Sequence, residues 1–151
     1  MDRHLTLSEI AEEYTAGYAA NGKKIIIACV ERDVLKCFFS DWEWLNLGLI
    51  VSERLLKMPK EARKQGIADI ARKAIEGAVS GNVVIENIDL LFSPEYALDV
   101  IKLFTLAGKN KCLVILWEGT YRDGILTYAE PGCEDYHCYE IKNYDVYCVT
   151  E

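Results

Sequence analysis

One stretch decides the fold: Lys24-Ile25-Ile26-Ile27-Ala28-Cys29-Val30, which runs into Glu31-Arg32-Asp33-Val34-Leu35-Lys36-Cys37. Its first half is continuous, apolar and rich in β-branched residues, which is typical of a strand covered on both faces in a parallel sheet. Two further runs of this kind occur at residues 83–85 and 111–117. Because helical patterns separate the three runs, the sequence predicts an α/β fold with a mostly parallel sheet flanked by helices.

Helix signals surround these strands. Thr6 and Glu9 form a capping box for a first helix that we expect to end at Asn21-Gly22. Pro59 and Pro94 stand where proline opens a helix, the second after a Ser93 cap. We therefore predict helices at 6–21, 31–40, 49–58, 59–80 and 93–106, a brief strand at 45–47, and short, partly antiparallel edge strands at 125–128 and 146–149.

The composition is that of a globular protein. A chain of 151 residues, 51% of them hydrophobic, fits one domain over 1–151, with an N-terminal helix in 1–22 leading into it. No apolar run approaches the roughly 18 residues that span a bilayer, and no apolar signal segment follows Met1. We expect a cytoplasmic protein that does not enter membranes. The net charge of −7 makes it a poor general binder of polyanions.

The cysteines and histidines predict neither a metal site nor a catalytic centre. Cys29, Cys112 and Cys148 lie in apolar runs, where a free thiol behaves as a small hydrophobe. Cys133 and Cys138 flank a histidine with C-x4-C spacing, and no second cysteine pair completes four zinc ligands. No serine or cysteine nucleophile is accompanied by a histidine and a third, orienting group.

The segment after the first strand lacks the features of a phosphate-binding loop. Such a loop uses glycines, so that backbone N–H groups point at the phosphates, followed by Lys and Ser/Thr. If Lys36 takes the lysine position, Val30 and Leu35 replace the glycines, and Cys37 replaces the hydroxyl that binds magnesium. Because β-branched and bulky residues disfavour positive φ, we expect this segment either to collapse onto the sheet edge or to form a short helix that fills the vacant pocket, with Trp42 or Trp44 close by.

Two other strand ends carry acids. Glu86-Asn87 follows the strand at 83–85, as a Walker-B acid follows its strand, although Asn87 cannot act as a base. Glu118 follows the strand at 111–117, where it would repel a phosphate. An acid after an apolar strand is also common without any function. We expect Glu86 and Glu118 to lie close together, with Lys36 or Arg32 as an ion-pair partner.

Five motifs carry a resemblance to a known family: Asn46-Leu47-Gly48-Leu49, Leu55-Leu56-Lys57-Met58-Pro59, Glu86-Asn87-Ile88-Asp89-Leu90-Leu91-Phe92, Trp117-Glu118-Gly119, and Leu126-Thr127-Tyr128-Ala129-Glu130-Pro131-Gly132 with Tyr136 and Tyr139. This is a resemblance, over residues 24–149, to the small P-loop protein of type 3 bacteriophage-exclusion (BREX) systems. It implies a RecA-like P-loop fold and membership of an antiphage defence operon. The chain departs from the family at the site: Leu35-Lys36-Cys37 replaces Gly-Lys-Ser/Thr, Glu86-Asn87 replaces Asp-Asn, and Trp117-Glu118-Gly119 replaces Trp-Asn-Gly.

Two groups of residues outside this site are candidates for partner binding. Basic residues concentrate in 53–73, which favours a docking face for an acidic partner or nucleic acid, or the solvated face of amphipathic helices. Trp42 and Trp44 fill the space that a nucleotide would occupy, mark a protein interface, or pack in the core, and the sequence leaves these three alternatives open. The candidate interaction residues are Arg54, Lys57, Lys60, Arg63, Lys64, Trp42 and Trp44.

Three functions remain open from the sequence. The leading hypothesis is a non-catalytic or weakly nucleotide-binding component of a phage-defence complex, which acts through protein–protein contacts, with no cofactor and with self-association left open. The second is an active P-loop NTPase, in which Lys36, Cys37, Glu86, Asn87 and Glu118 would bind ATP and magnesium. The third is a nucleic-acid-binding module that uses the basic helices of 53–73.

Overall fold

A six-stranded parallel sheet forms the centre of the computed structural model, which describes residues 4–14 and 25–150. The strand order is β1-β9-β2-β5-β4-β3, and every neighbouring pair is parallel. The expectation of an α/β fold with a mostly parallel sheet is thereby confirmed. The strands are β1 (His4–Thr6), β2 (Ile25–Ala28), β3 (Glu43–Asn46), β4 (Asn82–Glu86), β5 (Cys112–Leu116) and β9 (Tyr147–Thr150).

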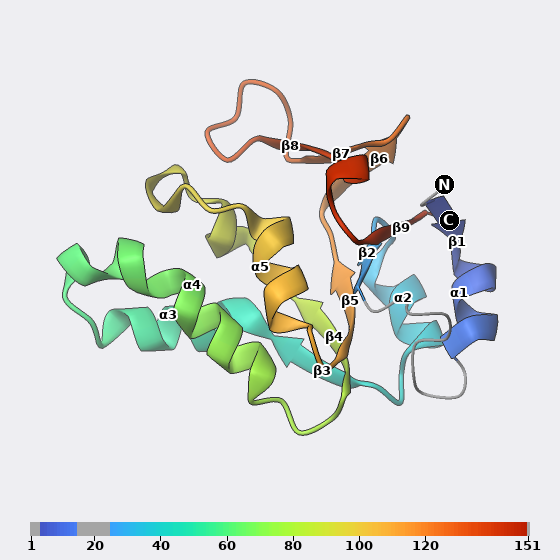
Figure 1. Cartoon of the computed structure of the whole chain (residues 1–151), viewed down its shortest axis with the longest axis horizontal. Coiled ribbons are helices and arrows are strands. Elements are labelled where there is room, and N and C mark those ends of the chain that lie inside the picture. Colours follow the sequence, from blue (N-terminus) through green and yellow to red (C-terminus); the bar gives the residue numbers. More distant parts are fainter. Residues whose placement is uncertain (1–3, 15–24, 151) are drawn as a thin grey trace.

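Helices cover both faces of this sheet (Figure 1). On one face, α3 (Leu47–Leu56), α4 (Lys60–Glu76) and α5 (Val100–Ala107) pack over side chains such as Ile27 and Ile85. On the other face, α1 (Leu7–Tyr14) and α2 (Arg32–Phe38) cover Ile26, Val84 and Val114. Alternate residues of β2 and β4 therefore enter different cores, which explains why these strands are apolar without a polar–apolar alternation.

A small antiparallel sheet is joined to this body by aromatic packing. Its strands are β6 (Gly119–Arg122), β7 (Ile125–Tyr128) and β8 (His137–Glu140), in the order β6-β7-β8. The Tyr128 ring stacks on Phe92, with 3.6 Å between the ring centroids, and Trp117 meets Phe92 edge-on at 5.2 Å. Phe92 belongs to the 3-10 helix η2 (Asp89–Phe92); the described residues also include the 3-10 helices η3 (Pro94–Tyr96) and η4 (Ile141–Asn143).

The first turn of α1 has the predicted capping box. The Glu9 backbone N–H donates to Thr6 Oγ1 over 3.4 Å, and the Thr6 hydroxyl donates to Glu9 Oε1 over 3.1 Å. The predicted continuation of this helix to residue 21, and the predicted strand start at Lys24, lie outside the described residues.

Three other sequence-based expectations were wrong. The strand near 146–149 is not an antiparallel edge strand, because β9 lies between β1 and β2 and is parallel to both. The helix predicted from Ser93 starts only at Val100: Ser93 makes no capping bond, Ala97 has a left-handed φ of 48°, and the Asp99 carboxylate caps α5 instead. Helix α4 ends at Glu76, with Gly77 as its C-cap, rather than at residue 80.

Among residues 4–14 and 25–150, no helix combines the length and the apolar character needed to cross a bilayer.

Candidate functional site

The connection between β2 and α2 is too short to cradle a phosphate. Only Cys29, Val30 and Glu31 separate the two elements. The Glu31 backbone is extended, its carbonyl accepts the first helical hydrogen bond from Leu35, and the buried Leu35 side chain packs in one cluster with Trp42. The predicted short helix with Trp42 nearby is thus confirmed, because an apolar residue at position 35 turns into the core.

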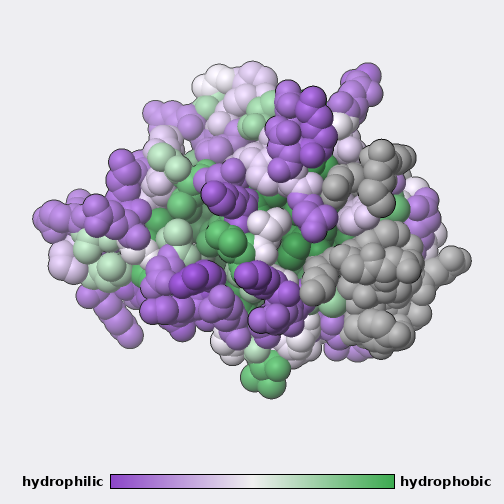
Figure 2. Space-filling view, in the orientation of Figure 1, coloured by the Kyte–Doolittle hydropathy of each residue, from purple (hydrophilic) through white to green (hydrophobic). Residues whose placement is uncertain are grey.

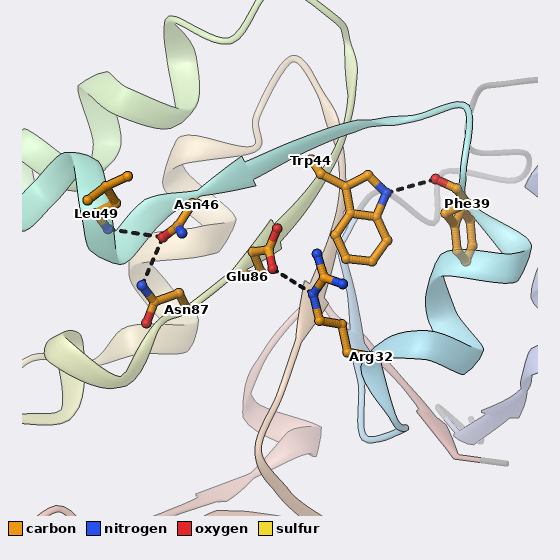
Figure 3. Close-up of polar contacts among 7 residues, drawn as sticks. All are labelled: Arg32, Phe39, Trp44, Asn46, Leu49, Glu86 and Asn87. Carbon is orange, nitrogen blue, oxygen red and sulfur yellow. Dashed lines mark hydrogen bonds and ion pairs between the residues drawn. The ribbon is translucent and has the colours of Figure 1, made fainter.

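Arg32 and Lys36 of α2 are held by partners within the chain. Arg32 Nε donates to Glu86 Oε1, at the end of β4, over 2.9 Å, and this hydrogen bond raises the pKa of the guanidinium. The Lys36 ammonium lies 4.2 Å from the ring centroid of Trp44. The Arg32 guanidinium carbon lies 5.1 Å from the same centroid, and Figure 3 shows Arg32 beside Trp44 and Glu86. Trp44 is fixed in turn, because its indole N–H donates to the Phe39 carbonyl over 2.9 Å. We call Arg32, Lys36, Trp44 and Glu86 the α2 cation cluster.

Asn87 takes part in a structural junction rather than in a water-activating site. Its φ of 60° is left-handed, and its Nδ2 donates to Asn46 Oδ1 over 2.8 Å (Figure 3). The same Asn46 oxygen accepts from the Leu49 backbone N–H over 3.0 Å and caps α3. Gly48 permits this arrangement, because a Cβ there would collide with the Asn87 carbonyl oxygen. The junction ties the end of β4 to the first turn of α3.

A cavity of about 430 Å³ remains beside α2, at the carboxyl ends of β2 and β5. Its lining residues are Cys29, Val30, Glu31, Arg32, Leu116, Trp117, Glu118 and Gly119. Ligands of open α/β sheets bind at such strand ends. The expectation that the helix fills the whole pocket is therefore wrong in part. Burial raises the pKa of the Cys29 thiol to about 12, so this thiol is neutral and a poor nucleophile.

Glu118, which lines this cavity, is influenced by a second carboxylate. The carboxylate of Asp89, followed by desolvation, raises the pKa of Glu118. Asp89 also accepts a hydrogen bond of 2.5 Å from the Tyr128 hydroxyl, and burial together with this bond raises the pKa of Tyr128. The carboxylate that acts on Glu118 is therefore that of Asp89. Glu86 instead forms an ion pair with Arg32, one of the two partners expected from the sequence.

We predict that Glu118→Gln stabilises the protein at neutral pH. Because the folded-state pKa of Glu118 is raised, ionisation of this carboxyl opposes folding above that pKa, and the penalty disappears as the pH falls below the ordinary glutamate value. The expected gain near pH 7.5 is about 0.2–1 kcal/mol, the range of exposed charge pairs. Urea unfolding at several pH values measures it. In an Asp89→Asn background the gain should shrink, and an undiminished gain there would exclude Asp89 as its cause.

The remaining predicted site residues do not gather at this place. The Cys37 side chain is exposed on α2, and Trp42 is a buried core residue. The basic candidates Arg54, Lys57, Lys60, Arg63 and Lys64 lie on α3, α4 and the turn between them. All six cysteines are free, and no group of three or more His, Cys, Asp or Glu side chains among the described residues is arranged to hold a metal ion.

Sequence reasoning missed two contributors. The Asn46 cap was detectable, since Asn before an apolar helix is a common N-cap, but the helix was expected to begin at Leu49. The bond between Tyr128 and Asp89 had no local signal, because the two residues are 39 positions apart and meet only when the small sheet packs on η2.

The chain matches no protein-family model, and no curated protein or solved structure matches it.

Proposed function

We propose that this protein is a RecA-like P-loop domain that no longer performs nucleotide chemistry and acts through protein–protein contacts in a bacteriophage-exclusion defence complex. Two features support the fold assignment: the family resemblance over residues 24–149, and the strand order. Strand β5, which follows the Walker-B-like β4, lies between β4 and β2, the place that RecA-like sheets give to their sensor strand.

The α2 cation cluster carries the proposal that nucleotide chemistry is lost. In an active P-loop, the lysine is free to reach the β- and γ-phosphates, and the acid at the end of the Walker-B strand orients magnesium. Here Lys36 lies on the Trp44 ring, and the Glu86 carboxylate is paired with Arg32. ATP binding would have to break both contacts. The carboxylates of Glu31 and Glu118 in the adjoining cavity add repulsion toward a triphosphate.

An ATP titration tests this proposal. We expect isothermal titration with ATP and magnesium to give no saturable binding at micromolar concentrations, and phosphate release to stay at the level of a protein-free blank. Lys36→Ala should change neither result, while the tryptophan emission shifts because Trp44 loses its cation. Lys102→Ala, an exposed lysine of α5, is the matched control and should leave the emission unchanged. Micromolar binding, or turnover that Lys36→Ala abolishes, would refute the proposal and restore the NTPase hypothesis.

The defence role has a separate test. In a host that carries this protein with a phage-exclusion system, deletion of its gene should restore phage plating, and a Lys36→Ala copy should exclude phage as well as the wild-type copy does. Unchanged exclusion after deletion would remove the protein from the defence complex. A Lys36→Ala copy that fails to complement, despite normal protein levels, would show that this lysine has an active role.

A further inference from the structure

The α3–α4 hairpin projects from the body of the protein and ends in the turn around Met58 (Figure 1). At this end the surface is mostly hydrophilic, with small apolar areas among the charged side chains (Figure 2). We call five exposed side chains of the hairpin the hairpin surface: Leu49 and Leu56 of α3, and Lys57, Lys60 and Lys64 at the turn and the start of α4. The exposed Glu53 lies between the two leucines along α3. Arg54 is not included, because at about 100° per residue it lies roughly 150° around the helix from the leucines.

The solvent side of α3 carries leucines where polar residues are usual. Leu47, Val51 and Leu55 recur every fourth residue and are buried against the sheet. Leu49 and Leu56 lie on the opposite side of the helix, with 52% and 74% of their surface exposed. They are seven residues apart, so they stand two turns apart on one stripe. Partner helices use anchor residues with this spacing when they pack along a helix or groove.

The basic side chains of the hairpin surface differ from those farther along α4 in their ion pairing. Farther along α4, Arg72 and Lys73 are paired with Asp69, at 2.9 and 3.0 Å. By contrast, none of the basic residues of the hairpin surface forms an ion pair within the described part of the chain. Arg63 is not included, because its guanidinium donates to the Met58 carbonyl over 3.3 Å and closes the turn. The hairpin surface is thus a local positive region on a protein with a net charge of −7.

We propose that the hairpin surface binds an acidic amphipathic helix of a partner protein, with the partner's apolar residues on Leu49 and Leu56 and its carboxylates on Lys57, Lys60 and Lys64. Charge complementarity decides between occupants. A second copy of this surface would bring two sets of unpaired cations together, with Glu53 between the leucines facing its own counterpart. The phosphates of a nucleic acid would pair with the basic side chains, but they would leave Leu49 and Leu56 without apolar contacts. The proposal deepens the proposed function, because it names the class of protein that the defence component contacts.

Fluorescence anisotropy with the full-length protein tests this proposal. The probe is a labelled peptide of about 20 residues, rich in glutamate, with leucines at i, i+4 and i+7. A scrambled peptide of the same composition and a labelled single-stranded DNA of about 20 nucleotides are the comparison probes. We expect the amphipathic peptide to bind at least about tenfold more tightly than the scrambled peptide or the DNA. The reason is that only the amphipathic peptide can place leucines on Leu49 and Leu56 and carboxylates on the basic side chains at the same time.

Matched variants locate the binding surface. Lys57→Glu/Lys64→Glu should weaken peptide binding by about tenfold or more, whereas Lys102→Glu/Lys142→Glu, which makes the same change in net charge elsewhere, should not. Leu56→Ser should weaken binding by about tenfold, and its thermal unfolding should match that of the wild type because Leu56 is exposed.

Each contrary outcome overturns the proposal. No saturable binding of the amphipathic peptide rejects the surface as a site for this class of partner. Equal binding of the amphipathic and scrambled peptides reduces the interaction to charge alone. Tighter binding of DNA, with a steep salt dependence, would assign the hairpin surface to nucleic acid instead. The ATP titration is independent of these measurements, so failure here leaves the loss of nucleotide chemistry intact, and the reverse also holds.

Discussion

Trp117→Ala is expected to reduce the free energy of unfolding by about 3–5 kcal/mol, the usual range for removing a large aromatic side chain from a core. Only 2% of the Trp117 surface is exposed. Its ring meets Phe92 and Tyr128 edge-on, and its indole N–H donates to the Thr127 carbonyl over 2.8 Å. The substitution removes the contact that joins the small antiparallel sheet to the end of β5 and leaves a backbone acceptor without its donor.

Urea unfolding followed by far-UV circular dichroism measures this effect. Trp117→Phe separates the contribution of the ring contacts from that of the hydrogen bond, because the ring contacts largely persist while the hydrogen bond is lost. For this variant we expect the free energy of unfolding to fall by about 1–2 kcal/mol. Trp44→Ala is the control for removing an indole from a half-buried position, and it should cost clearly less than Trp117→Ala. A decrease below about 1 kcal/mol for Trp117→Ala would mean that the small sheet is held by other contacts.

Gly48→Ala is expected to destabilise the protein by about 1–3 kcal/mol, although alanine is the better helix former. In a helix interior this exchange ordinarily stabilises by up to about 1 kcal/mol. At Gly48 the new methyl group would meet the Asn87 carbonyl oxygen, which is backbone and cannot rotate away. Relief requires α3 to shift from the end of β4, which strains the Asn46–Asn87 hydrogen bond.

Gly66→Ala supplies the matched control for this prediction. Gly66 also lies in a helix, but its added methyl group would meet side-chain atoms and no backbone: the terminal carbon and sulfur of Met58, at 2.7 and 3.4 Å, and Ile70 Cδ1, at 3.9 Å. A flexible methionine side chain can move away. We expect Gly66→Ala to be neutral or to raise the unfolding temperature, opposite in sign to Gly48→Ala. If both variants gained stability, the contact between α3 and Asn87 would be looser than the structure describes.

The central strands of the sheet were predictable, because a strand that is buried on both faces has a continuous run of apolar residues in the sequence. β2, β4 and β5 coincide with the three continuous apolar runs. The helix at α2 was predictable for a related reason, since Val30 and Leu35 disfavour the backbone angles of a phosphate loop.

Other elements depend on partners far away in the chain. β1 has three residues and pairs with β9, and nothing local distinguishes either strand from an edge strand or a loop. Ser93 has the composition of a cap, yet the segment after it forms η3 and Ala97 turns left-handed before α5 begins. Packing on the sheet decides such boundaries, and propensity does not.

The sequence predicted where the residues of the candidate site come together, but not which side chains contact one another. Strand-end reasoning placed Glu86 near α2, because parallel strands present their carboxyl ends at one edge. Glu86 forms its ion pair with Arg32 rather than with Lys36, because the Lys36 ammonium lies over the Trp44 ring. The contact between Lys36 and Trp44 depends on the directions in which side chains of α2 and β3 point. These directions cannot be derived from the sequence.

The pairing of β1 with β9 has a consequence for folding during synthesis. His4 stands opposite Cys148, so the first described strand has no neighbour in the sheet until residues 148–150 have been made. Among the strands of residues 4–14 and 25–150, β9 lies between β1 and β2 and pairs with both. A ribosome that adds about 5–20 residues per second leaves β1 waiting for about 7–29 seconds, while β2, β5, β4 and β3 can already assemble. The sheet therefore closes last at the edge where its earliest and latest residues meet, and contacts with such long sequence separation are the slow step of folding.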